Sequence, residues 1–188
     1  MLRPIAAGLL VATLSAATAA GGDAALKFEL SSTDVHQGKM VPAANVFNGM
    51  GCTGQNLSPE LSWKGAPEGT KSFAVTMYDP DAPTGSGWWH WVVYNIPTAT
   101  TSLVSGAGDP SKNLLPAGAT QGNTDFGAPG YGGPCPPPGS KDHHYQIIVY
   151  ALKVEKLDLP ATATAAYVSF NLHANMLAKA ELTAVYKR

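Results

Sequence analysis

Residues 72–97 read SFAVTMYDPDAPTGSGWWHWVVYNIP, and this stretch predicts two strands joined by a rigid loop. The side chains of 72–78 alternate between two faces, which is typical of a strand. Residues 89–96 are rich in aromatic and β-branched side chains, which also favour a strand. Prolines in the connecting loop fix backbone angles and remove two amide donors. The ionisable side chains of Asp79 and His90 therefore lie at a loop–strand junction on apolar supports, where functional sites are often built.

The same stretch resembles a family signature. DPDAP at 79–83, followed by His90 and a tryptophan, is similar to the motif of the phosphatidylethanolamine-binding proteins, in particular their bacterial, Raf-kinase-inhibitor-like branch. Two further blocks match this family, GQNLSPELSW at 54–63 and GGPCPPPGSKDHHY at 132–145. Because the three blocks occur in order, the resemblance is specific. It extends over residues 28–186, nearly the whole chain after the amino-terminal segment.

Patterns along the rest of the chain predict a mainly β fold. Strands are expected at residues 25–31, 72–78, 89–96, 144–155 and 180–186, with one helix at 163–178. The buried face of this helix would consist of Ala165, Val168, Leu172 and Met176. Residues 98–130 are rich in Gly, Pro, Asn and Thr and are predicted to be mostly loop. This order fits an all-β, two-sheet Greek-key sandwich with a helix near the carboxyl terminus. The family resemblance implies the same fold, with a large central sheet flanked by a smaller one.

The amino-terminal residues predict export. Residues 1–20 are interpreted as a signal peptide, with Arg3, an apolar run at 5–14 and small residues at 17–19 before the cleavage site. The apolar run is too short to cross a bilayer, which needs roughly 20 apolar residues. A retained anchor is the alternative, but the flanking residues favour cleavage. We therefore expect a periplasmic or secreted protein without a transmembrane segment, with a single domain at 21–188.

Composition limits the partners and the redox state. The formal net charge is −1, and the Lys and Arg residues are scattered, so neither nucleic acid nor an anionic membrane surface is an expected partner. Cys52 and Cys135 are the two cysteines, and in an oxidising compartment they are expected to form a disulfide. A catalytic thiol is the alternative, but a paired cysteine is not a nucleophile.

The family resemblance also implies a pocket. It would be a small surface cavity that takes anions such as phosphate, acetate or the phosphoryl head of an ethanolamine lipid. The matching positions of this chain are Asp79, Pro83, His90, Gly133, Pro137, His143 and Tyr145. Imidazole, phenol hydroxyl and the amides of Gly-rich turns can donate hydrogen bonds to a phosphoryl group. On a strand, His143 and Tyr145 share a face, and His144 points away from it. A carboxylate repels an anion, so Asp79 would accept a proton from the ligand, pair with His90, or bind a ligand ammonium.

Two classes of function follow from these residues. The favoured one is an exported binding protein for a small anionic or phosphorylated ligand, without a cofactor and with no metal site. The resemblance adds docking to a partner protein such as a protease, whereas inhibition of a cytosolic kinase does not suit an exported chain. The rival is an enzyme, in which Asp79, His90 and His143 form a metal site or an acid–base pair for phosphoester hydrolysis. The sequence contains no nucleophile elbow, helical zinc motif or Walker-type loop to support the rival.

Overall fold

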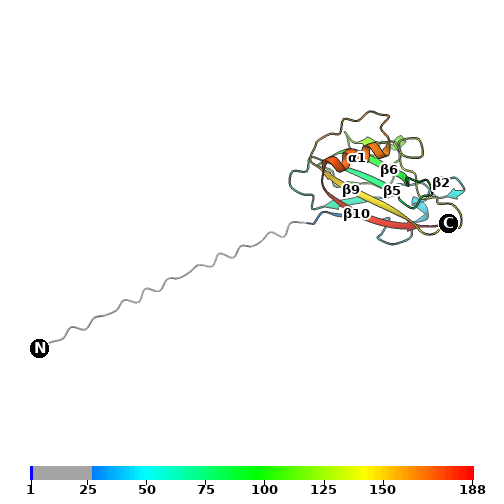
Figure 1. Cartoon of the computed structure of the whole chain (residues 1–188), viewed down its shortest axis with the longest axis horizontal. Helices are drawn as coiled ribbons and strands as arrows, with labels where there is room; N and C mark the ends of the chain where they lie inside the picture. The colour runs from blue at the N-terminus through cyan, green and yellow to red at the C-terminus, as the bar shows by residue number, and fades with distance from the viewer. Residues whose placement is uncertain (2–26) are drawn as a thin grey trace.

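The central layer of the fold is a five-stranded antiparallel sheet in the order β10-β9-β5-β6-β8 (Figure 1). The computed structural model describes Met1 and residues 27–188, so the predicted signal peptide lies almost wholly outside the described residues. The strands of this sheet are β5 (Ser72–Asp79), β6 (Trp88–Pro97), β8 (Thr120–Gln121), β9 (His143–Leu152) and β10 (Met176–Tyr186). The chain leaves the sheet after β6 and returns through β8 to β9, which pairs with β5.

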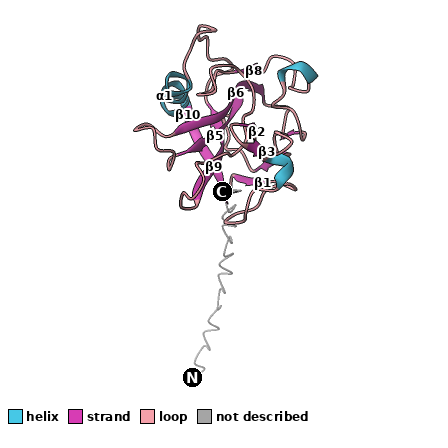
Figure 2. Ribbon diagram, turned by 90° about the vertical axis from the view of Figure 1, so that its right-hand side faces the viewer, coloured by secondary structure: helices cyan, strands magenta, loops and turns pink. Residues whose placement is uncertain are grey.

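A smaller sheet and a helix cover the two faces of the central sheet (Figure 2). The smaller sheet has the order β1-β4-β7, with β1 at Glu29–Ser31, β4 at Leu61–Lys64 and β7 at Ser102–Leu103. The opposite face is covered by α1 (Ala165–Asn175). The remaining elements are the hairpin of β2 (Asn48–Gly49) and β3 (Cys52–Thr53) and the 3-10 helices η1 (Ala43–Asn45) and η2 (Pro110–Lys112).

Strand alternation divides the apolar side chains between two cores. On β5, Phe73, Val75 and Met77 pack toward the small sheet, whereas Ala74 packs under α1. The core on the small-sheet side also contains Leu61, Trp63, Trp91, Leu103, Tyr145, Ile147 and Val149. The core under α1 contains Val92, Tyr94, Ile148, Tyr150, Leu152, Val168 and Leu172. Both faces of the central strands β5 and β6 are therefore mostly buried, and the pocket described below lies at the ends of these strands.

The mainly β fold with one helix near the carboxyl terminus is confirmed. The helix is shorter than the prediction of 163–178, because Met176 is already extended and begins β10. It also begins two residues later than predicted, at Ala165, because the Thr164 side chain accepts a hydrogen bond from the Tyr167 amide at 3.2 Å and caps the helix there. Pairing of β10 with β9 thus overrides helical periodicity at this end. Within the described residues, no helix is long and apolar enough to cross a membrane.

Candidate ligand-binding site

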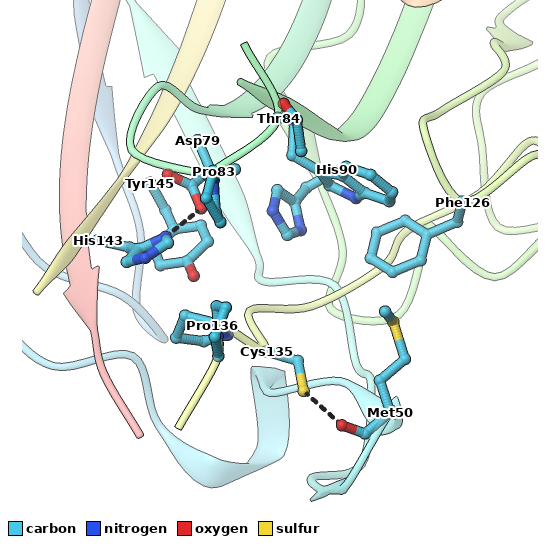
Figure 3. Close-up of a pocket in the computed structure, with 13 residues that line it drawn as sticks. Met50, Asp79, Pro83, Thr84, His90, Phe126, Cys135, Pro136, His143 and Tyr145 are labelled. Atoms are coloured by element: carbon cyan, nitrogen blue, oxygen red, sulfur yellow. Dashed lines mark hydrogen bonds and ion pairs between the residues drawn. The ribbon is translucent and has the colours of Figure 1, made fainter. Parts of the chain in front are cut away.

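A pocket of about 200 Å³ lies at one end of three neighbouring strands of the central sheet, β9, β5 and β6 (Figure 3). Because β5 runs antiparallel to both β6 and β9, its last residue, Asp79, lies beside the first residues of the other two strands. The lining residues are Met50, Asp79, Ala82, Pro83, Thr84, Trp88, His90, Phe126, Cys135, Pro136, Pro137, His143 and Tyr145. Six of the seven positions matched from the sequence are among them, and Gly133 is not.

A β-bulge turns His90 toward this pocket. Met77 pairs with Trp91, but the next residue of β5, Tyr78, pairs with Trp89, so His90 is the extra residue of β6. Strict alternation would place Trp89 and Trp91 on one face of the sheet. Instead Trp91 packs in the small-sheet core and Trp89 against the core under α1. The bulge therefore allows two consecutive side chains, those of His90 and Trp91, to lie on the same side of the sheet.

The imidazole of His90 is buried and held in one protonation state. Its Nδ1 lies 2.6 Å from the carbonyl oxygen of Gly132, and the Gly132 amide donates to the His90 carbonyl at 2.9 Å. A carbonyl oxygen can only accept, so Nδ1 carries the proton. Burial lowers the pKa of His90 to about 4, against the opposing effect of the Gly132 hydrogen bond. At neutral pH the ring is uncharged, and Nε2 therefore presents a lone pair.

Asp79 pairs with His143 rather than with His90. The His143 Nδ1 lies 2.7 Å from one carboxylate oxygen of Asp79, and both side chains are buried. The other carboxylate oxygen accepts a hydrogen bond from the Asp81 amide at 2.8 Å. The sequence left three roles open for Asp79, and one of them was pairing with His90. The structure shows pairing with His143 instead. The carboxylate orients the His143 ring by fixing a proton on Nδ1.

A second aspartate–histidine pair lies on the outside of the same junction. The Asp81 carboxylate accepts from the His144 amide at 2.8 Å and lies 2.7 Å from His144 Nδ1. Desolvation opposes the shift, but these hydrogen bonds to His144 lower the pKa of Asp81. Both side chains are well exposed, so this pair braces the loop after β5 against β9 and does not enter the pocket.

Tyr145 lies between the two imidazoles and provides a free donor. Its ring centroid is 5.1 Å from that of His90 and 6.5 Å from that of His143. The side chain is fully buried, yet its hydroxyl has no hydrogen-bond partner among the described residues. Burial raises the pKa of Tyr145, and the charge and the nearby acceptor oxygens of Asp79 raise it further, so the hydroxyl stays protonated. The Asp79 carboxylate is thus close to this hydroxyl, but the two groups do not reach hydrogen-bonding geometry. A buried hydroxyl without a partner is costly unless a ligand or water satisfies it.

Comparison with known proteins identifies the family. The family model described as phosphatidylethanolamine-binding protein matches residues 31–187. The chain belongs to the phosphatidylethanolamine-binding protein family. It is 51% identical over 179 residues to the UPF0098 protein YbcL of Escherichia coli K12, which covers 95% of this chain and 97% of YbcL. The UPF0098 protein YbhB of the same organism is 49% identical over 158 residues, covering 84% of this chain and 99% of YbhB.

Solved structures of this family share the fold. The crystal structure of E. coli YbcL, described as a new member of the mammalian PEBP family, superposes with a TM-score of 0.84 and 53% identity. The match covers 86% of this chain and 98% of YbcL. A putative phosphatidylethanolamine-binding protein homologue from Chlamydia trachomatis has a TM-score of 0.71 and 29% identity, covering 87% and 99% of the two chains. The family resemblance seen in the three sequence blocks is confirmed.

A disulfide closes the wall of the pocket opposite Asp79. Cys52 and Cys135 are bridged, as their number and the predicted export suggested. Cys135 lines the pocket, and so does Met50 from the turn between β2 and β3. Gly133 lies behind this wall, where an added β-carbon would be 2.2 Å from the carbonyl oxygen of Asn45. This family position therefore allows two backbones to pack closely and does not contact the cavity.

Two lining residues, Phe126 and Met50, lie outside the stretches of sequence from which the pocket was predicted. Phe126 comes from the long loop 98–130, and its ring lies 5.5 Å from both His90 and Trp88. Met50 is largely exposed at the mouth of the cavity. Neither residue lies in a block that resembles the family motif, and no local pattern marks it. The one available signal was that a long loop in a small domain is usually functional.

Asn56 holds the peptide that positions His90. Its side-chain amide donates to the Tyr131 carbonyl at 3.0 Å, and its oxygen accepts from the Gly133 amide at 2.8 Å. These two bonds flank Gly132, whose carbonyl oxygen contacts His90 Nδ1. Asn56 lies in the 54–63 block, one of the three that resemble the family signature. In the structure this block fixes an imidazole of the pocket through its contacts with the backbone around Gly132.

We expect Asn56→Ala to shift the tautomer of His90. Without the clamp on both sides of Gly132, the carbonyl that keeps the proton on Nδ1 is no longer held, and the Nε2–H form gains population. Nitrogen-15 NMR of the imidazole ring measures this shift directly. Asn95→Ala is the matched control, because Asn95 likewise has a positive φ and its side chain makes two hydrogen bonds, to the backbone of Leu157. An unchanged His90 tautomer in Asn56→Ala would contradict the positioning role.

Proposed function

We propose that this family member is an exported binding protein whose pocket holds a small anion or a phosphorylated head group. The observation that carries the proposal is the buried hydroxyl of Tyr145, a donor that lacks a partner among the described residues and lies between His90 and His143. The volume of about 200 Å³ suits a head group and not a whole lipid, since pockets for drug-sized ligands measure about 300–1,000 Å³.

The test separates binding from stability. Tyr145→Phe removes the hydroxyl and keeps the ring. We expect it to weaken phosphorylethanolamine binding about tenfold, the value of one hydrogen bond to a charged group. The same change is expected to leave the free energy of unfolding unchanged or to raise it by about 1 kcal/mol, because an unsatisfied buried hydroxyl is removed. Calorimetric titration and chemical unfolding measure the two quantities.

Tyr131→Phe is the matched control for Tyr145→Phe. Tyr131 is also buried, but its hydroxyl donates to the Asn45 carbonyl at 2.8 Å and lies outside the pocket lining. This control should lower stability by about 1 kcal/mol and leave binding intact. His90→Ala is a second pocket variant that should also weaken binding. Equal affinities of wild type, Tyr145→Phe and His90→Ala would remove the assigned pocket.

The metal-enzyme alternative receives no support from the arrangement of side chains. The described part of the chain contains no group of three or more His, Cys, Asp and Glu placed to hold a metal ion. The Asp79 carboxylate already pairs with His143 Nδ1, and the Nδ1 of His90 is already bonded to the Gly132 carbonyl oxygen. Export, and docking to a partner such as a protease, stay predictions from the sequence and the family resemblance. Amino-terminal mass analysis of protein from the outer compartment tests the first of these.

A further inference from the structure

The pocket offers an anion unusually little positive charge. Within the described residues its lining contains neither lysine nor arginine. Its charged group is the Asp79–His143 pair, whose net charge is zero when the imidazole is protonated and −1 when it is neutral. An oxyanion placed beside the Asp79 carboxylate is repelled unless a proton lies between them. Coulomb attraction to a fixed cation therefore does not explain how this lining would select an anion.

The hydrogen-bonding pattern of the lining is instead mixed. Tyr145 supplies a donor, as argued above. His90 supplies an acceptor, because its Nδ1–H is used by the Gly132 carbonyl and its Nε2 has no hydrogen-bond partner among the described residues. The lowered pKa of His90, about 4, is consistent with this neutral acceptor form. A ligand that satisfies both groups has to accept from Tyr145 and donate to His90, and the Asp79 carboxylate is a further acceptor in the same lining.

We infer that the pocket selects oxyanions that retain a proton, such as phosphate or a protonated phosphomonoester, over oxyanions that have none, such as sulfate. This inference rests on the proposed anion-binding function, and the feature of the anion that the pocket would recognise is its retained proton. An unprotonated oxygen of the ligand accepts from the Tyr145 hydroxyl. The P–OH group donates toward the lone pair of His90 Nε2 or the Asp79 carboxylate. Sulfate at neutral pH has the same shape but no proton, so the acceptors of the pocket face its lone pairs.

The experiment compares inorganic phosphate with sulfate. The full chain is titrated calorimetrically with each ion at pH 7 and equal ionic strength. We expect phosphate to bind at least about tenfold more tightly, because sites that require a donor from the ligand strongly reject analogues without one. Equal affinities for the two ions would overturn the inference and leave the proposed function standing. If neither ion bound, the proposed anion pocket would fail, and the inference with it.

A variant assigns the preference to His90. His90→Gln replaces the fixed acceptor by an amide that can turn either its oxygen or its NH₂ group toward the ligand. The ratio of phosphate to sulfate affinity should therefore fall toward one. His36→Gln is the control, because His36 is exposed and outside the pocket lining, and it should keep the wild-type ratio.

If His90→Gln folds poorly, Tyr145→Phe is measured instead. This variant removes a donor that both ions use. It should therefore weaken the binding of each ion and preserve the ratio of the two affinities. A wild-type ratio in a folded His90→Gln protein, or a ratio that collapses in Tyr145→Phe, would count against the assignment.

Discussion

Replacing both Cys52 and Cys135 by serine is expected to lower the free energy of unfolding by about 4 kcal/mol. The disulfide joins residues 83 positions apart, and closing a loop of this length removes much of the conformational freedom of the unfolded chain. Denaturant unfolding of the oxidised wild type and of the double variant measures the difference. Since Cys135 also lines the pocket, ligand affinity should fall in the variant as the wall loosens.

Reduction supplies an internal check on the disulfide. A reducing agent should lower the stability of the wild type to that of the double-serine variant, and it should not affect the variant. A double variant as stable as the oxidised wild type would show that the bridge contributes nothing to the folded state. Stability lost equally by both proteins in reductant would point to a cause other than this disulfide.

Gly133→Ala is expected to cost about 3 kcal/mol of unfolding free energy, the upper range for overpacking. The added β-carbon would lie 2.2 Å from the carbonyl oxygen of Asn45 and 2.6 Å from the Phe47 amide nitrogen. Neither backbone group can shift without loss of a hydrogen bond. The Asn45 carbonyl accepts from the Tyr131 hydroxyl, and the Phe47 amide donates to the Pro134 carbonyl. The measurement is chemical or thermal unfolding, with binding of phosphorylethanolamine as a second readout.

Gly139→Ala is the control for Gly133→Ala. Gly139 has a positive φ of 77°, but no atom lies within 4 Å of its added β-carbon. Alanine there should cost only about 1 kcal/mol, the strain of the left-handed conformation. Equal losses for the two variants would mean that close approach of two backbones is not what position 133 requires.

Much of the fold could be predicted from local patterns. Alternation of apolar side chains located β5 and β9, and the residues 165, 168 and 172 that the helix buries were correctly identified. The end of the helix was wrong by a few residues, because pairing with β9 decides where β10 begins. Strand order was not predictable, since it depends on contacts between segments far apart in the sequence. Only the family resemblance pointed to a large central sheet with a smaller one beside it.

The site was predicted unevenly for a physical reason. Residues that lie at strand ends, such as Asp79 and His143, are placed by periodicity and by the motif together. The partner of Asp79 was not predictable, because choosing His143 over His90 depends on which ring nitrogens the backbone already occupies. Phe126 and Met50 come from irregular loops, and their positions depend on the tertiary fold alone.

The extra residue in β6 has a consequence for how the site can be lost. Point substitutions leave the length of the strand unchanged, so they alter the chemistry at position 90 without moving its backbone. Deleting His90, the one residue between Trp89 and Trp91, would restore regular pairing of β5 with β6 and remove the imidazole from the cavity. In an alignment of relatives, a gap at this point would therefore indicate a changed pocket even where the other lining residues are kept.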